Sequence, residues 1–151
     1  MTTLKQQLQE DLTAAIRARD ELRSSTIRLT LSAVTAEEVS GKSKRELSDS
    51  EVLKVVVREA KKRREAAEAF EQAGRTESAA RERAEGEVLA QYLPQQLSDE
   101  ELTAIVAAAV AESGATGPQA MGAVMKLVRP KVGDRAEGGR VAAAIKAALA
   151  G

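Results

Sequence analysis

Apolar residues recur at helical spacing along almost the whole chain, and this pattern restricts the fold more than any other feature. A first stripe repeats every four residues, on one face of a helix, and consists of Leu4, Leu8, Leu12 and Ile16. Thr2 or Thr3 is available to cap that helix, and the pattern leaves open whether the chain breaks between Asp20 and Ser25. Because no segment shows a convincing strand pattern, the sequence predicts an all-α fold of roughly seven helices.

Two helix starts carry the same capping signal, in which a serine is followed three residues later by a glutamate. The Ser48 side chain can accept a hydrogen bond from the Glu51 amide, while the Glu51 carboxylate returns to the Ser48 amide. Ser98 and Glu101 repeat this arrangement, and apolar residues flank both boxes as in a hydrophobic staple. Helices are therefore predicted to begin just after both serines.

Glycine and proline residues divide the chain into helices and into two domains. Gly74 is the expected end of a long helix, and Thr76 is the expected cap of the next one. Pro94 has no amide hydrogen and disfavours helical geometry at the preceding residue, so the chain is expected to turn there. We predict an N-terminal domain of long helices over residues 1–94 and a small three-helix domain over residues 95–151.

The C-terminal domain is predicted to contain short helices that glycine and proline separate. One helix is expected to begin at Thr116 or Gly117, with a proline in its first turn, where a missing amide hydrogen is harmless. Its buried face is predicted to consist of Met121, Val124, Met125 and Val128. Pro130 is its expected end, and the last helix is expected to begin between Asp134 and Gly139.

The absence of two residue types excludes most catalytic chemistry. The chain has no cysteine and no histidine, so disulfides, thiolate nucleophiles, imidazole metal ligands and Ser-His-Asp constellations are impossible. It also lacks a phosphate-binding loop and the glycine- and serine-rich loop of a Ser/Lys amidase. We therefore expect no catalytic residues, no metal and no cofactor. Without a membrane-spanning run or a secretory signal, the protein is expected to be cytoplasmic.

The C-terminal part is cationic although the whole chain has a net charge of zero. From Pro118 to Gly151 there are six basic and two acidic residues, which gives this segment a charge of +4. A cationic helical hairpin on a neutral protein points to an anionic partner. Phe70 and Tyr92 are the only aromatic residues, so recognition of single strands by base stacking is not expected. An RNA partner would be held through its shape and its phosphates.

Two interpretations compete for the charged and glycine-rich segments. The basic run Lys61–Arg64 is interleaved with glutamates, so ion pairs on a solvated face are preferred to a nucleic-acid signal. The C-terminal cations have few carboxylates beside them, and a solvated surface is the alternative to anion binding. Gly133 and Gly138 permit a phosphate to approach backbone amides closely. Gly122 is expected to permit close packing of two helices.

Four segments, in chain order, carry a recognisable pattern: Ile27–Leu29 with Ser32 and Ala33, Leu47–Leu53, Tyr92–Ser98, and Met121–Lys126 continued through Pro130, Lys131 and Arg135–Gly138. Together they resemble the YqeY family. These are small bacterial proteins similar to the C-terminal tail of the B subunit of the glutamine-dependent aspartyl/glutamyl-tRNA amidotransferase. The resemblance covers nearly the whole chain, and its most specific parts are the Tyr-Leu-Pro-Gln-Gln-Leu segment and the final helix–turn–helix.

The resemblance implies an N-terminal helical domain and a C-terminal three-helix domain. In the amidotransferase, the corresponding tail contacts the body of the tRNA and helps to position it, while chemistry occurs elsewhere. Similar modules are fused to some glutaminyl-tRNA synthetases, and the family is often labelled a carbon–nitrogen ligase with glutamine as nitrogen donor. The residues that match the family's C-terminal motif are Gly122, Lys126, Lys131, Arg135 and Gly138. Glu137 stands where the family often has aspartate.

Charge and position add Arg129 and Arg140 to these candidate nucleic-acid-binding residues, and Gly133 is added because it permits close backbone approach. The first hypothesis is a non-catalytic tRNA-binding accessory module whose C-terminal hairpin contacts the RNA backbone. The alternative is an adaptor that docks on an aminoacyl-tRNA synthetase or an amidotransferase. Its support is the zero net charge, which provides no general attraction to nucleic acid. The sequence leaves the oligomeric state open.

Overall fold

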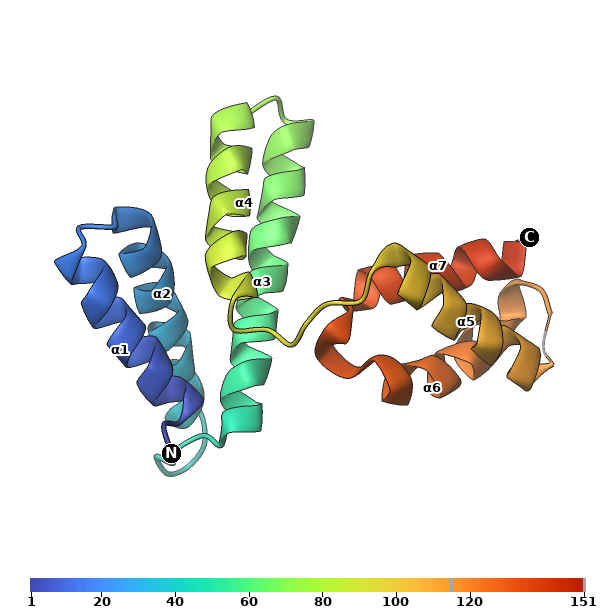
Figure 1. Cartoon of the computed structure of the whole chain (residues 1–151), viewed down its shortest axis with the longest axis horizontal. Helices are drawn as coiled ribbons and strands as arrows, with labels where there is room; N and C mark the ends of the chain where they lie inside the picture. Colours follow the sequence, from blue (N-terminus) through green and yellow to red (C-terminus); the bar gives the residue numbers. More distant parts are fainter. Residues whose placement is uncertain (115, 151) are drawn as a thin grey trace. The chain divides into compact units, whose positions relative to one another are not determined.

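The computed structural model describes residues 1–114 and 116–150, and the regular structure in these ranges is entirely helical (Figure 1). It consists of seven α-helices and two short 3-10 helices, which confirms the predicted all-α class. Contacts between Cα atoms divide the chain into two units, residues 1–93 and 94–151, and each unit has its own core. No helix within the described ranges is both long and apolar enough to cross a membrane.

The N-terminal unit begins with the hairpin of α1 (Leu4–Arg17) and α2 (Glu21–Glu38). Thr3 caps α1, in agreement with one of the two predicted caps. The break that the sequence left open occurs at Arg19, which has a φ of +57°. The Asp20 side chain then caps α2. A left-handed residue and a side-chain cap together end one helix and begin the next.

A second hairpin consists of α3 (Asp49–Gln72) and α4 (Thr76–Ala90). The capping box at Ser48 is confirmed, with both of its hydrogen bonds formed. The predicted capping by Thr76 is wrong. Thr76 is already the first helical residue, and Arg75 at the cap position makes no side-chain bond to the helix. A cap needs non-helical backbone geometry, which Thr76 does not have.

The core of the N-terminal unit joins all four of its helices near the bases of the two hairpins. The buried side chains are Leu8, Ile27, Val34, Val52, Val55, Val56, Val88 and Leu89. Just after α4, the hydroxyl of Tyr92 donates a hydrogen bond to the Asp11 carboxylate on α1. Burial, with this carboxylate, raises the pKa of Tyr92. The end of α4 is thus attached to α1 by a polar contact beside the apolar core.

Charged residues pack between α3 and α4. The Arg63 side chain is only 13% exposed, and its Nε lies 3.1 Å from Glu85 Oε2. A second carboxylate, that of Glu59, is 7% exposed and lies 3.7 Å from Arg63 Nη2, while Glu82 lies 4.0 Å from Arg63 Nε. One guanidinium therefore holds three carboxylates together in a partly dehydrated layer between the helices.

The described part of the C-terminal unit contains three α-helices and two 3-10 helices: α5 (Asp99–Ser113), η1 (Pro118–Ala120), α6 (Met121–Val132), η2 (Gly133–Arg135) and α7 (Gly138–Ala150). The capping box at Ser98 is confirmed, and the predicted start of the last helix agrees with Gly138. The largest buried side chains of its core are Leu97, Leu102, Val106, Val124, Val128, Val132, Val141 and Ile145.

The prediction that Pro130 ends its helix is wrong. The helix α6 continues through Pro130 to Val132. Proline lacks only the amide that would bond to the carbonyl four residues earlier, so near the C-terminal end of a helix the loss is confined to one hydrogen bond. Burial of Val128 and Val132 in the core offsets that loss. The helix ends instead at Gly133, where φ is +54°.

Candidate nucleic-acid interface

One side of α6 packs into the core of the C-terminal unit, and this determines which of its residues face outwards. Val124, Val128 and Val132 are buried and lie four residues apart, so they share one side of the helix. Met121 and Met125 are half-buried beside them, as expected for core residues. The helix has three basic residues and no acidic one. The charged side chains that α6 exposes are therefore all positive.

Gly122, Lys126 and Arg129 form that outward side, which we call the α6 face. The three residues are separated by four and then three positions, so their side chains emerge from the same side of the helix. All three are exposed. Within the described part of the chain, neither Lys126 nor Arg129 has an ion-pair or hydrogen-bond partner for its side chain. Their charges are available to an external anion.

The structure gives Gly122 a different setting from the predicted one. Close helix packing was expected, but a Cβ atom added at Gly122 would have no heavy atom of the described residues within 4 Å, so that prediction is wrong. Glycine within a helix costs about 1 kcal/mol relative to alanine. Packing within the described part of the unit therefore does not explain a glycine at this position.

Lys131 lies on a different side of α6 from the α6 face. It follows Lys126 by five residues, which rotates it well away around the helix. Its Nζ atom is 3.4 Å from Glu112 Oε2 of α5, and both side chains are about half exposed. Such pairs contribute little to stability. Lys131 is thus partly neutralised by the protein and does not extend the α6 face.

The turn after α6 is bound by the segment that precedes α5. The Leu97 amide donates a 2.7 Å hydrogen bond to the Arg135 carbonyl. Gln96 Nε2 donates to the Asp134 carbonyl at 3.0 Å and to the Pro94 carbonyl at 2.8 Å. The carbonyl groups of this turn therefore face the protein itself.

Arg135 and Arg140 also contact the segment around α5. Arg135 Nε donates a long, 3.5 Å hydrogen bond to the Gln95 carbonyl, although its side chain is exposed. Arg140 Nη2 donates to the Leu97 carbonyl and to Asp99 Oδ1, both at 2.9 Å. The Arg140 contacts join α7 to the start of α5. Arg140 therefore has a structural role. Arg135 makes only a long contact of this kind, and its exposed guanidinium is still accessible from solvent.

The start of α7 already contains a carboxylate. Glu137 Oε1 accepts a hydrogen bond from the Gly139 amide at 3.2 Å. A phosphate at this helix terminus would have to displace that carboxylate. Gly133 and Gly138 are exposed, and an added Cβ would meet nothing within 4 Å at either position. The two glycines are accessible, but the amides beside Gly138 are less free than the sequence suggested.

The family of the chain follows from its whole length. The family described as Yqey-like protein matches residues 5–149. The chain belongs to the YqeY family. No curated protein sequence matches it. The family resemblance of the four sequence segments is thereby confirmed, while the similarity to the amidotransferase tail stays a prediction.

In this YqeY protein, only part of the predicted residue set comes together. Gly122, Lys126 and Arg129 share the α6 face, and Arg129 was chosen on charge and position alone. The other basic residues of the set have partners within their own unit. The sequence analysis did not select Gln96, whose side chain holds the turn after α6. The sequence did offer an indication, since the amide side chain lies two residues after Pro94 and can donate to carbonyl groups.

The basic run Lys61–Arg64 of this YqeY protein is neutralised locally, as predicted. Lys61 pairs with Glu65 at 3.8 Å, and Lys62 pairs with Glu59 at 3.0 Å. Arg64 lies 3.5 Å from Glu68, and the buried Arg63 holds the carboxylates described above. This segment of α3 therefore offers no net positive surface comparable to the α6 face.

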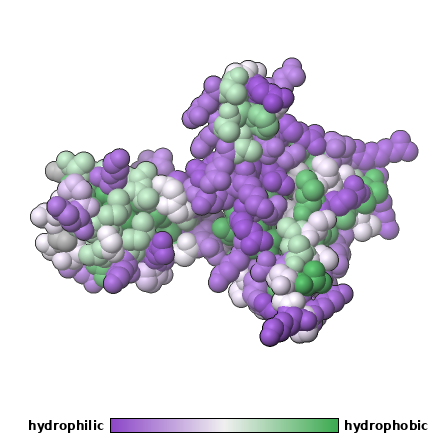
Figure 2. Space-filling view, turned by 180° about the vertical axis from the view of Figure 1, so that it is seen from behind, coloured by the Kyte–Doolittle hydropathy of each residue, from purple (hydrophilic) through white to green (hydrophobic). Residues whose placement is uncertain are grey.

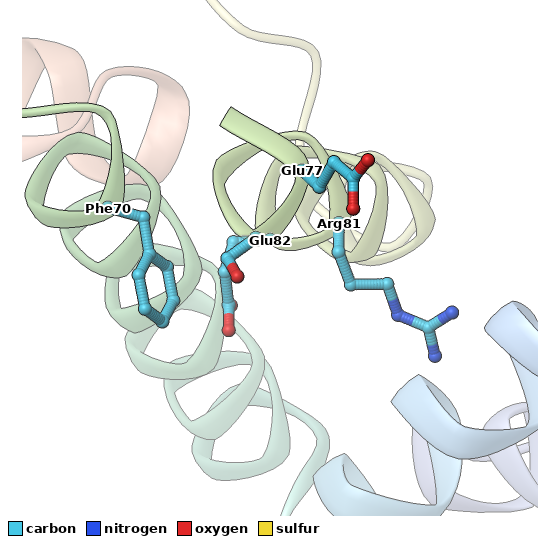
Figure 3. Close-up of a pocket in the computed structure, with 5 residues that line it drawn as sticks. Phe70, Glu77, Arg81 and Glu82 are labelled. Atoms are coloured by element: carbon cyan, nitrogen blue, oxygen red, sulfur yellow. The ribbon is translucent and has the colours of Figure 1, made fainter. Parts of the chain in front are cut away.

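An open depression lies between the ends of α3 and α4 in the same YqeY protein (Figure 3). It is lined by Phe70, Glu77, Ser78, Arg81 and Glu82. Arg81 points away from its floor towards α2, where it pairs with Glu21. Burial, with the neighbouring Glu85, raises the pKa of Glu82. These groups do not form an acid–base pair aimed at a common point. Within the described ranges, no cluster of acidic residues has the geometry of a metal site.

Proposed function

We propose that this protein is a non-catalytic accessory module that binds tRNA through the α6 face. The observation that carries the proposal is the pair of exposed cations Lys126 and Arg129 beside Gly122. These cations have no partner within the described residues, on a helix without acidic side chains. Phosphate groups attract such cations and release condensed counterions on binding. Gly122 lets the RNA backbone approach the helix without meeting a side chain.

Recognition in this proposal is directed at the RNA backbone and its shape. The C-terminal unit contains no aromatic residue, because Phe70 and Tyr92 both belong to the N-terminal unit. Tyr92 is also held by Asp11. Base stacking on this unit is therefore not available, and contacts to phosphates and sugars remain. The expected ligand is a folded RNA such as tRNA.

A partner protein would supply the chemistry associated with this family. The amidotransferase connection suggests carbon–nitrogen ligation with glutamine as nitrogen donor. In our proposal that reaction belongs to an amidotransferase, and the present chain positions tRNA for it in the cytoplasm. The basis is the lack of histidine and cysteine, which leaves few groups able to act as base or nucleophile near neutral pH.

The test is a charge reversal on two helices. Lys126→Glu/Arg129→Glu reverses the charge of the α6 face, whereas Lys61→Glu/Lys62→Glu makes the same change of charge on α3. We expect the first variant to bind unmodified tRNA at least about tenfold more weakly, with a shallower dependence of the affinity on salt. The α3 variant should bind like the wild type. Filter retention over a range of salt concentrations measures both quantities, with circular dichroism as the check on folding.

Equal effects of the two charge reversals would attribute binding to net charge and overturn the proposal. Unchanged tRNA affinity in the α6 variant, with its fold intact, would also overturn it. No tRNA binding by the wild type, over the whole range of salt, would exclude the RNA-binding function itself.

The adaptor remains a second candidate because α2 presents an exposed face with little charge. Leu29 and Val39 are 53% and 52% exposed there, and Ser32 and Ala36 lie between them at helical spacing. Figure 2 shows pale and green surface on the side of the N-terminal unit that holds the α1–α2 hairpin, among otherwise purple residues. Exposed apolar surface of this kind can dock a partner helix. Binding to purified amidotransferase or glutaminyl-tRNA synthetase that survives nuclease treatment, and that Leu29→Lys abolishes, would favour the adaptor.

A further inference from the structure

The segment Pro94–Leu97 lies outside the α6 face, yet it forms several hydrogen bonds within the C-terminal unit. It belongs to the Tyr-Leu-Pro-Gln-Gln-Leu sequence, one of the two most specific parts of the family pattern. In the C-terminal unit it lies against the turn between α6 and α7, the other specific part. The two sequence signatures of the family are therefore in direct contact, although about 40 residues separate them.

The end of α6 needs support from outside the helix. Pro130 removes the hydrogen bond that would otherwise reach the Lys126 carbonyl. Gly133 then leaves helical geometry with a φ of +54° and a ψ of −131°. Its own amide returns to the helix, where it bonds to the Arg129 carbonyl. The last turn, which contains Arg129, has thus lost part of the hydrogen bonding that would fix it.

Two groups of the Pro94–Leu97 segment bind the turn that follows. The Leu97 amide binds the Arg135 carbonyl at 2.7 Å, and Gln96 Nε2 binds the Asp134 carbonyl at 3.0 Å. The second proton of the same Gln96 amide binds the Pro94 carbonyl at 2.8 Å, so the side chain is held at both of its donors. This is the only side chain of the segment that bridges its own backbone and the turn, in the part of the chain that the structure describes.

We infer that Gln96 is a positioning residue for the α6 face. By holding the turn after α6, it keeps the last turn of the helix folded and Arg129 in place beside Lys126. This inference rests on the proposed RNA-binding function, but Gln96 itself contributes no charge and need not touch the RNA. Gln96 would raise the affinity because the last turn of α6 is already ordered before RNA binds, so that less conformational entropy is lost on binding.

The neighbouring residue supplies a matched control. Gln95 is exposed and has the same side chain, and among the residues that the structure describes it forms a hydrogen bond only through its backbone carbonyl. Gln96→Met and Gln95→Met make the same change of shape and polarity one residue apart. Gln96→Glu keeps the shape of the side chain but replaces its donors with oxygen atoms that repel the two carbonyls.

The experiment combines amide hydrogen exchange without RNA and tRNA affinity measured over salt. In Gln96→Met and Gln96→Glu, exchange should accelerate at the Leu97 amide and in residues 127–135, while the N-terminal unit is unchanged. In Gln96→Met, which leaves the net charge unchanged, affinity for tRNA should fall about fivefold with the same salt slope, because the number of phosphate contacts is the same. Gln95→Met should leave exchange and affinity at wild-type values. A merely structural role would lower the melting temperature and leave the affinity of the folded fraction unchanged.

Two results overturn the inference while leaving the proposed function intact. One is unchanged exchange at Leu97 and residues 127–135 in both Gln96 variants. The other is faster exchange with unaltered tRNA affinity, in the same assay in which Lys126→Glu/Arg129→Glu does lose affinity. If the α6 charge reversal has no effect either, the RNA-binding function itself fails.

Discussion

Two basic segments of this chain differ in what surrounds their cations. Lys61–Arg64 contains four consecutive cations, yet glutamates on α3 and α4 neutralise it. The α6 face has only two cations, Lys126 and Arg129, and neither has a partner within the described ranges. Local cation density is therefore a poor guide to the positive charge that a folded surface presents. Pairing decides this, because a paired cation has already lost much of its attraction for phosphate.

The same contrast separates structural from available arginines. Arg63 and Arg140 are tied to carboxylates or carbonyls, and their side chains are 13% and 33% exposed. Arg129 is exposed and makes no such bond among the described residues. Substitution of the first kind should change stability, whereas substitution of the second kind should change binding. The following predictions test this division, beginning with the largest expected effect.

Replacement of Arg63 by alanine should have the largest effect on folding. It leaves Glu59, Glu82 and Glu85 close together without their cation, and breaking a buried pair in this way costs about 3 kcal/mol. Lys126→Ala should change the free energy of unfolding by less than about 0.5 kcal/mol. Tyr92, the only tyrosine, belongs to the N-terminal unit, so its fluorescence during urea denaturation measures the change. Equal stability of the two variants would contradict the division.

Arg140→Ala should destabilise the C-terminal unit by about 1.5 kcal/mol, because it removes charge-assisted hydrogen bonds to the Leu97 carbonyl and to Asp99. Lys146→Ala is the control, since Lys146 is exposed on the same helix and has no partner among the described residues. Thermal unfolding by circular dichroism should show the loss, while Tyr92 fluorescence should be unaffected. A shift in the tyrosine transition would indicate that Arg140 acts beyond its own unit.

Gly122→Ala should separate stability from binding. Alanine in a helix is favoured over glycine by about 1 kcal/mol, and the added Cβ meets no neighbour within 4 Å, so the C-terminal unit should become more stable. On the α6 face the same methyl group should weaken tRNA binding by obstructing the backbone. Thermal unfolding and filter retention together measure the two effects. A more stable variant with undiminished affinity would show that the RNA does not approach Gly122.

The smallest expected effect concerns acid stability of the α3 start. The Arg45 guanidinium and the Ser48 amide lower the pKa of Glu51 from 4.5 to about 2. A depressed pKa stabilises the folded state above pH 4.5, and this contribution is lost as the pH falls towards 2. Glu51→Gln should therefore unfold with a weaker dependence on pH in this window, as followed by tyrosine fluorescence. A Glu51→Gln variant with the wild-type dependence on pH would contradict this prediction.

Local sequence signals predicted most helix boundaries, but not the start near Thr76 or the end near Pro130. The boxes at Ser48 and Ser98 are reliable because both partners lie within four residues of each other. The prediction from Pro130 was wrong because the free energy that an internal proline costs a helix depends on its place in the helix and on burial of the last turn. Thr76 misled because several residues near a helix start can satisfy the sequence pattern for a cap, and backbone geometry selects among them.

The sequence by itself determined the all-α class and most helix starts, since these depend on short-range spacing and residue type, and it showed that neither histidine nor cysteine is present. It also contained the family signature. Only the tertiary structure decided which cations remain free, because pairing depends on residues brought together from distant segments. Arg140 meets Asp99 across 41 positions, while Lys126 meets no carboxylate in the described ranges. Tertiary packing determines which residues neutralise a charge, and the spacing of apolar residues along the sequence does not specify these pairs.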